Sequence, residues 1–198
     1  MKIQQKLAIG FFRTKINMLN LVNKKWAAQQ AFRLFCTPMM KSTYKGKTIP
    51  PHAERLQFSF NGSLIKGFRF NHPQKKKVML LHGFSSSAFN FFKYVEPLEH
   101  KGYEVLAFDA PAHGESEGNT VNAVDYSEMI KKVINLYGPV DAFIGHSFGG
   151  IAISLAIEQL PHDANTKIVL IAPATETVTA IEGAFNMLGI RNNTIRQE

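Results

Sequence analysis

Residues 143–150 read Phe-Ile-Gly-His-Ser-Phe-Gly-Gly and contain the pattern Gly-x-Ser-x-Gly, with Ser147 at its centre. A mostly apolar run at 140–144 precedes the pattern, and an apolar stretch compatible with a helix follows it at 151–160. Strand, sharp turn and helix form the context in which this pattern indicates a nucleophile elbow. The glycines two positions before and after the serine let the backbone turn back without a clash, so the Ser147 hydroxyl is expected to project above the sheet. The alternative is a glycine-rich turn whose serine has no chemical role.

Apolar stretches between turn signals predict the other strands and helices of the chain. Two strands, 55–60 and 64–70, flank Asn61-Gly62, which is a strong hairpin signal. The other strands are expected at 78–81, 104–108, 140–144 and 167–171, and the helices at 89–100, 122–137 and 151–160. Because strands and helices alternate and the strands are largely apolar, the predicted fold class is α/β, a mostly parallel sheet with helices on both faces.

Particular residues mark the ends of two of these helices. Pro97 is expected to break or kink the helix at 89–100, and Gly102 to end it. Asn122 is placed to cap the helix at 122–137, which Gly138 follows.

Length and composition are those of one ordinary globular domain. The chain has 198 residues, of which 45% are hydrophobic and 19% charged, so it can bury a sizeable core. Its single cysteine, Cys36, excludes an intramolecular disulfide and fits a reducing compartment. No apolar run reaches the length of a membrane span, and Arg13 and Lys15 interrupt the apolar core that a signal peptide would need. A cytoplasmic location is therefore expected, either free or peripheral to a membrane.

Positive charge is concentrated at the start of the chain. Residues 1–53 contain ten Lys or Arg residues and no Asp or Glu, whereas the remainder contains 13 basic and 15 acidic residues. The formal net charge of +8 therefore belongs to an N-terminal arm and not to the rest of the chain. Nucleic-acid binding is not expected, because no recognised reading motif accompanies this charge.

The N-terminal arm has the spacing of an amphipathic helix. The helix is expected over residues 3–26 and to continue through 27–36, and Pro38 with residues 41–51 is predicted to form a polar linker. Three roles remain open for it. The helix could pack on the domain by its apolar stripe, lie on an anionic membrane through residues 1–36, or serve as a transit peptide, which its low serine content disfavours.

Three motifs follow one another along the chain. The first is Leu-Leu-His-Gly-Phe at 80–84, the second Phe-Asp-Ala-Pro-Ala-His-Gly-Glu-Ser at 108–116, and the third the turn around Ser147. In this order they resemble the motifs of the α/β-hydrolase family, and the resemblance covers about residues 53–174. The resemblance implies residues 1–52 as a basic helix and linker, 53–174 as an incomplete hydrolase core, and 175–198 as the start of a helical lid.

The resemblance also implies a serine hydrolase that acts on a carboxylic ester or thioester through an acyl-enzyme. Ser147 is the expected nucleophile, and the N–H groups of Phe84 and Phe148 are the expected oxyanion donors, each contributing about 3 kcal/mol. A serine hydroxyl needs a base to take its proton. His82 and His146 are expected to hold loops. No metal or organic cofactor is implied, and the expected partner is a small apolar acyl substrate.

The expected order of the catalytic triad is Ser, acid, His, and the chain departs from it. The only histidine after Ser147 is His162, which follows the helix at 151–160 and should lie at the opposite end of the sheet. We therefore expect an N-terminal portion of a longer hydrolase of roughly 270–300 residues, without the last strands and with 167–171 as an open sheet edge. The alternative is a natural short protein that lost its base and works as a non-catalytic binding or scaffold protein.

Overall fold

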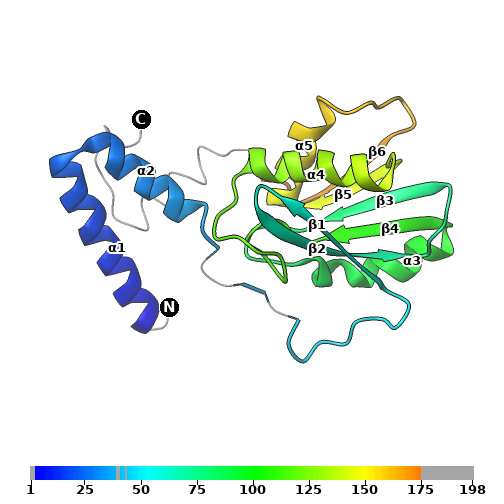
Figure 1. Cartoon of the computed structure of the whole chain (residues 1–198), viewed down its shortest axis with the longest axis horizontal. Coiled ribbons are helices and arrows are strands. Elements are labelled where there is room, and N and C mark those ends of the chain that lie inside the picture. The colour runs from blue at the N-terminus through cyan, green and yellow to red at the C-terminus, as the bar shows by residue number, and fades with distance from the viewer. Residues whose placement is uncertain (1–2, 39–40, 43, 175–198) are drawn as a thin grey trace. The chain divides into compact units, whose positions relative to one another are not determined.

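The computed structural model describes residues 3–38, 41–42 and 44–174, which fall into two compact units, residues 3–37 and 38–174. The first unit consists of helix α1 (Ile3–Val22) and helix α2 (Lys24–Phe35) (Figure 1). Asn23 between them is extended, and its Oδ1 accepts a hydrogen bond from the Trp26 N–H at 3.0 Å. The prediction of one helix continuing to residue 36 is therefore wrong, because an Asn side chain that caps the following turn starts a new helix.

A six-stranded sheet in the order β1-β2-β4-β3-β5-β6 forms the second unit. Its strands are β1 (Glu54–Phe60), β2 (Ser63–Phe70), β3 (Lys76–Leu81), β4 (Tyr103–Phe108), β5 (Ala142–His146) and β6 (Lys167–Ile171). The β1–β2 hairpin is antiparallel and turns through Asn61 and Gly62, both with positive φ, as the sequence predicts. Strand β2 also runs antiparallel to β4, whereas β3, β4, β5 and β6 are parallel, so the mostly parallel sheet is confirmed.

Four helical segments connect the strands of this sheet. They are the 3₁₀ segment η1 (Ala88–Tyr94) and the helices α3 (Val95–His100), α4 (Ala123–Tyr137) and α5 (Phe148–Ile157). Pro97 lies in the first turn of α3, where its missing N–H has no helical partner to lose, so the break falls just before it. Asn122 caps α4 in a reciprocal capping box with Asp125, and Gly138 follows the helix, as predicted.

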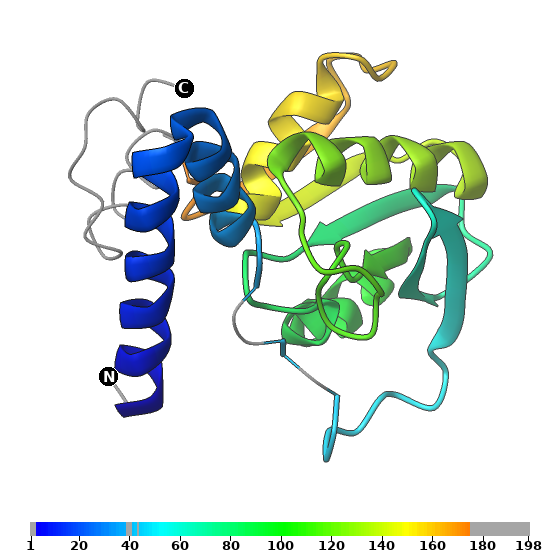
Figure 2. The ribbon, with the colours of Figure 1, turned by 60° about the vertical axis from the view of Figure 1, so that its left-hand side comes forward.

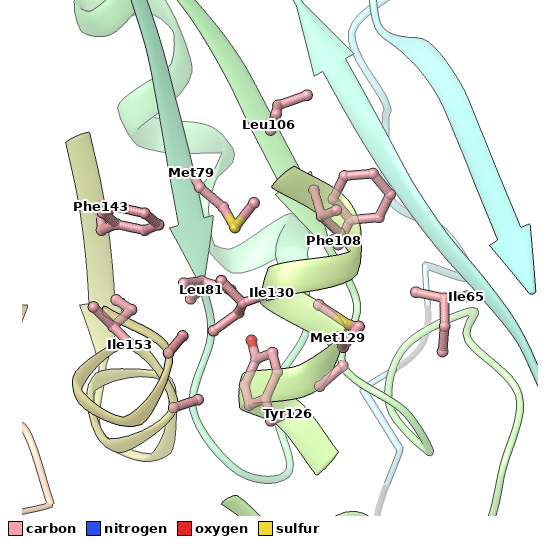
Figure 3. Packing of buried hydrophobic residues seen from close by; sticks show 14 of the residues in the cluster. Ile65, Met79, Leu81, Leu106, Phe108, Tyr126, Met129, Ile130, Phe143 and Ile153 are labelled. Carbon is pink, nitrogen blue, oxygen red and sulfur yellow. The ribbon is translucent and has the colours of Figure 1, made fainter. Parts of the chain in front are cut away.

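Two hydrophobic cores lie on opposite faces of the sheet. Met79 and Leu81 of β3 pack with α4 and α5, as Figure 3 shows around Tyr126 and Ile130. The alternate β3 residues, Val78 and Leu80, pack with η1 and α3 on the other face. Figure 2 shows the helices on both sides of the strands. The alternation follows from the two-residue period of a strand, and it confirms the predicted layers.

Strand β6 lies at one edge of the sheet. Within residues 44–174 it pairs only with β5, and its side chains Ile168, Val169 and Leu170 are exposed. Residues 175–198, for which the start of a helical lid is predicted, lie outside the described residues. In the part of the chain that is described, no helix is both long and apolar enough to cross a bilayer.

The segment predicted as a polar linker contains a core residue. Tyr44 is only 7% exposed, and its ring lies 5.6 Å from that of Phe68 and 5.8 Å from that of Phe89. Burying an aromatic ring removes a large apolar surface from water, which attaches this otherwise polar segment to the sheet unit.

Candidate active site

Ser147 occupies a strained turn between β5 and α5. Its φ of 50° and ψ of −114° lie in a region that residues other than glycine rarely adopt. A Cβ on Gly149 would lie 2.5 Å from the Leu81 carbonyl oxygen, and one on Gly145 would lie 2.5 Å from Ile153 Cδ1. The obstacle at Gly149 is backbone, which cannot move aside, whereas at Gly145 it is the end of a side chain with the Gly150 nitrogen at 3.0 Å. The turn therefore has the tight geometry that the sequence predicts, and glycine is required most strictly at 149.

Loops from three neighbouring strands meet at the carboxyl end of the parallel strands. The chain leaves β3 toward β4 on one side and returns to β5 on the other, which is the switch point where ligands bind in such sheets. Phe84 follows β3, and Phe148 begins α5 directly after Ser147. The rings of Phe84 and Phe148 are 5.5 Å apart and nearly perpendicular. The fold therefore brings together the regions of all three residues predicted to carry chemistry.

The backbone N–H groups of Phe84 and Phe148 are available at this end of the sheet. Neither donates a hydrogen bond to a carbonyl or side chain within the described residues. Phe148 is the first residue of α5, so its N–H is one of the helix-terminal donors without an intrahelical acceptor. Both N–H groups can therefore donate a hydrogen bond to a ligand oxygen.

His82 is fully buried and engages both ring nitrogens in holding loops. The Ala110 N–H donates to its Nε2 at 2.9 Å, so Nδ1 carries the proton and donates to the Gly83 carbonyl at 2.8 Å. Burial, with a smaller contribution from nearby His113, lowers the pKa of His82 to about 3. A neutral imidazole with no free nitrogen is unsuited to act as the base for Ser147.

His113 joins the loop after β4 to the loop after β3 in the same way. The Ser85 N–H donates to its Nε2 at 2.9 Å, and its Nδ1 donates to the Pro111 carbonyl at 3.0 Å. Burial is the main cause that lowers the pKa of His113. Its ring lies 5.2 Å from the ring of Phe84, so it also supports that side chain.

Two further histidines, His146 and His162, have different surroundings. His146 Nδ1 would lie 2.7 Å from a Cβ on Gly83, so the loop after β3 packs tightly against the residue before Ser147. His162 is exposed after α5, bonds the Leu160 carbonyl, and lies at the opposite end of the strands from Ser147, as expected. Among the described residues, no histidine or carboxylate is hydrogen-bonded to the Ser147 hydroxyl.

Asp109 is a buried carboxylate that ties three segments together, and sequence analysis identified it only as part of a motif. It accepts hydrogen bonds from the Tyr44 hydroxyl at 3.0 Å, the Ala88 N–H at 2.8 Å and the Glu115 N–H at 2.9 Å. Burial raises its pKa to about 6 against the opposing effect of these donors. A Cβ on Gly114, which has positive φ, would overlap this carboxylate. Asp109 therefore fixes the loops that frame the site.

Replacing His82 by glutamine tests the neutral state of this histidine. The unfolded chain binds a proton at His82 below a pH of 6.5, whereas the folded chain binds it only near 3. The wild type therefore loses stability as pH falls through this range, while His82→Gln lacks this loss. Urea unfolding gives the free energy of unfolding of each protein. The value for the wild type minus the value for His82→Gln should fall by up to about 1.4 kcal/mol for each pH unit as the pH is lowered from 6.5 toward 3. A difference that stays constant from pH 6.5 to 3 would contradict the assignment.

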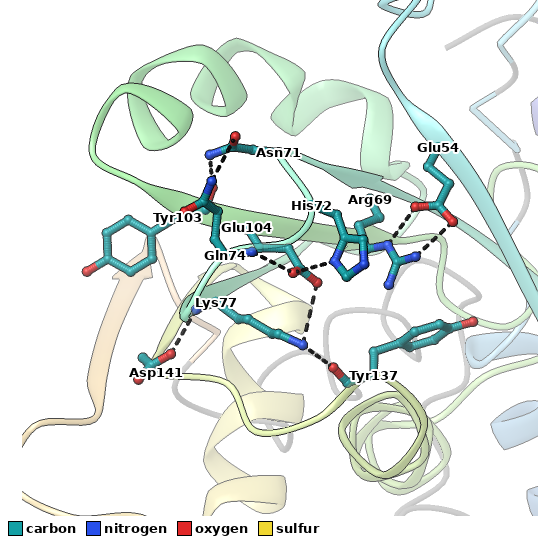
Figure 4. A network of polar contacts seen from close by, with 10 residues as sticks. All are labelled: Glu54, Arg69, Asn71, His72, Gln74, Lys77, Tyr103, Glu104, Tyr137 and Asp141. Atoms are coloured by element: carbon teal, nitrogen blue, oxygen red, sulfur yellow. Dashed lines mark hydrogen bonds and ion pairs between the residues drawn. The ribbon is translucent and has the colours of Figure 1, made fainter.

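A second polar network lies at the amino ends of the strands, away from Ser147 (Figure 4). The fully buried Glu104 accepts from His72 Nδ1 at 2.8 Å and lies 3.6 Å from Lys77 Nζ. The Lys77 N–H donates to Asp141 at 2.8 Å. The described part of the chain has no group of three or more His, Cys, Asp or Glu residues that could hold a metal ion. We assign this network to holding the strand ends together.

Comparison with known proteins identifies the family of this chain. The model described as the alpha/beta hydrolase family matches residues 78–195, more than half of the chain. The uncharacterized hydrolase YugF of Bacillus subtilis is 30% identical over 120 residues, which cover 58% of this chain and 43% of that protein. The putative chloroplastic methylesterase 11 of Arabidopsis thaliana is 24% identical over 181 residues, covering 86% of this chain and 45% of the relative.

A solved thioesterase domain from the curacin biosynthetic pathway shares the fold, with a TM-score of 0.54 at 22% identity. The match covers 71% of this chain and 55% of that one. This chain spans less than half the length of each of the two curated relatives, YugF and methylesterase 11. Six strands with helices on both faces, the turn at Ser147 and the family match lead to one conclusion: the chain belongs to the alpha/beta hydrolase family.

Proposed function

We propose that the protein that contains this chain is a serine hydrolase that cleaves a carboxylic ester or thioester through an acyl-enzyme. The observation that carries the proposal is the strained Ser147 at the same end of the sheet as two backbone N–H groups, those of Phe84 and Phe148, which have no acceptor in the described residues. The Ser147 Oγ attacks the acyl carbon and a base takes its proton. The C–O or C–S bond to the leaving group then breaks as that group receives the proton. Water hydrolyses the resulting ester and restores the serine.

The two N–H groups give the proposal its main electrostatic support. Attack on the acyl carbon builds negative charge on its oxygen, and preorganised donors stabilise that charge by about 3 kcal/mol each. Aromatic rings gather in the same region, since the Phe148 ring is 5.5 Å from that of Phe84 and 5.5 Å from that of Tyr126. An apolar acyl group would find contacts here, so we propose an apolar substrate.

We further propose that the base and its acid come from polypeptide beyond this chain. No described histidine is hydrogen-bonded to the Ser147 hydroxyl, and no histidine occurs in the sequence after His162. The length difference from the curated relatives supports this proposal. Residual oxyanion donors cannot replace a missing base, so the 198-residue chain alone should react slowly.

In the described residues, no base is hydrogen-bonded to the Ser147 hydroxyl. This observation favours a second candidate function, that of a non-catalytic binding or scaffold protein. In that case the strained serine would persist without reacting. The two candidates differ in one property, the nucleophilicity of Ser147 in the folded protein.

A fluorophosphonate probe measures that property directly. We expect the protein from the complete reading frame to be labelled on Ser147, located by peptide mass spectrometry, and the 198-residue chain to be labelled much more slowly. Circular dichroism of both samples shows that each is folded. A folded complete protein that stays unlabelled, or a label on another serine, would overturn the hydrolase proposal, and the first result would support the binding protein.

A further inference from the structure

Helix α1 has apolar side chains on two parts of its surface, one largely buried and one exposed. One face contains Phe12, Ile16 and Leu19, of which Ile16 is almost completely buried. The other face contains exposed apolar residues: Phe11, Met18, Leu21 and Val22. Leu21 and Val22 are 87% and 85% exposed. Packing of α1 within its own unit accounts for the apolar residues of the first face only. The exposed apolar residues of the second face are therefore available for a different contact.

Helix α2 also exposes apolar side chains, and these are aromatic. Its inward positions are the small residues Ala27 and Ala31, both fully buried. Trp26 and Phe32 are each 47% exposed. Large aromatic rings on an outward face are characteristic of sites that contact a partner or a membrane interface.

Basic residues accompany this apolar surface on both helices. The exposed ones are Arg13 and Lys15 of α1 and Lys24, Lys25 and Arg33 of α2. Residues 1–53 contain no Asp or Glu, so nothing in this part of the sequence neutralises them. The surface therefore combines exposed hydrocarbon with uncompensated positive charge.

We propose that residues 3–35 bind an anionic phospholipid surface, with α1 and α2 lying in the plane of the headgroups. The apolar residues would enter the boundary of the acyl chains, and the Lys and Arg side chains would reach the phosphates along their flexible stems. This occupant satisfies both properties of the surface. A second copy of the chain would oppose positive charge to positive charge, and a nucleic acid would leave Leu21 and Val22 uncovered.

Trp26 provides a direct signal of binding, because it is the only tryptophan in the chain. The full chain would be mixed with vesicles of phosphatidylcholine, or of equal parts phosphatidylcholine and phosphatidylglycerol. We expect co-flotation and a blue shift of tryptophan emission with the anionic vesicles at low salt, and much weaker effects with neutral vesicles or at high salt. The readout is independent of hydrolysis, so it stands or fails separately from the proposed function.

Two pairs of substitutions separate the apolar and electrostatic contributions. The double variant Leu21→Gln/Val22→Gln should bind anionic vesicles at least roughly tenfold more weakly. Its control, Val124→Gln/Leu136→Gln, replaces exposed apolar residues of the other unit and should bind like wild type.

The second pair of variants changes the net charge by the same amount at two different places in the chain. Lys24→Glu/Lys25→Glu should reduce binding at least roughly tenfold, because each lysine near an anionic surface contributes about 1 kcal/mol. The control Lys75→Glu/Lys76→Glu alters exposed lysines of the other unit and should have little effect.

Three results would overturn the proposal. They are no flotation with anionic vesicles at low salt, undiminished binding by the Leu21/Val22 variant, and equal binding by the two charge-reversal variants. Duplex DNA serves as a competitor. If DNA binds tightly and the Leu21/Val22 variant binds it equally well while vesicles do not bind, the surface is a nucleic-acid site and the lipid proposal fails.

Discussion

Replacing Ser147 by alanine is expected to lower the turnover of an ester or thioester substrate by roughly 10⁵–10⁶-fold in the complete protein. The substitution removes the oxygen that forms the acyl bond in the proposed mechanism, and water bound in its place lacks the fixed geometry of the serine. The oxyanion donors remain, because they are backbone groups, so substrate affinity should change little. Steady-state kinetics with a soluble aryl ester and with a thioester would measure turnover and KM separately.

A neighbouring serine is the matched control for this experiment. Ser85 is exposed, follows Phe84, and donates only its backbone N–H to His113. Ser85→Ala should therefore retain wild-type turnover within about twofold. Equal activity of Ser147→Ala and wild type would show that the chemistry uses another residue.

Replacing Gly149 by alanine is expected to destabilise the sheet unit by about 3 kcal/mol and to abolish labelling of Ser147. The added Cβ would lie 2.5 Å from the Leu81 carbonyl oxygen and 2.8 Å from that of His82. Both contacts are backbone atoms at the end of β3, which cannot rotate away as a side chain would. Relief of the clash must move the start of α5, and the Phe148 N–H and Ser147 move with it.

Gly150→Ala is the control, since it makes the same change one residue later in the same helix. Its Cβ would lie 3.2 Å from Pro173 Cβ and would meet no backbone atom closer than that. We expect a cost below about 1 kcal/mol and retained labelling. Urea unfolding followed by circular dichroism gives the free energies. Equal stability of the two variants would show that the turn is not as constrained as the structure implies.

Several features could be predicted from the sequence because short-range chemistry determines them. The hairpin follows from Asn61-Gly62, two residues that tolerate positive φ. The start of α4 follows from the Asn122 side chain, which bonds an N–H three residues later. The turn at Ser147 follows from the glycines on either side of it. In each case the interacting atoms belong to neighbouring residues, so the pattern alone contains the cause.

The break at Asn23 shows the limit of periodicity. The apolar spacing of residues 3–26 continues across Asn23 without interruption, yet the helix ends at Val22. The periodic pattern reports which face is apolar, whereas the cap depends on a single side chain that can bond either the helix or the turn. Asn23 is a common helix-capping residue and could have indicated the break, but the regular apolar spacing on both sides of it favoured a single helix.

The role of Tyr44 could be recognised only in three dimensions. Its hydroxyl bonds Asp109, 65 residues away, from a stretch whose composition indicates a linker. Likewise, the roles of His82 and His113 depend on backbone N–H groups contributed from 28 residues away in each case. Sequence analysis expected His82 to hold loops through the family resemblance, but the burial that keeps it neutral and the backbone groups that it bonds appear only in the fold.

The sequence by itself determined the α/β fold class, the order of the elements and the residues at the turn, because hydrophobic period, capping and φ preference act over a few residues. Only the tertiary structure decided which groups meet at the carboxyl ends of the strands. The fold packs the ring of Phe84 against that of Phe148 and buries Asp109, which the Tyr44 hydroxyl bonds. It also places hydrogen-bond partners at both ring nitrogens of His82. Such contacts join segments that are distant in the chain, and close packing of the two cores is what selects them.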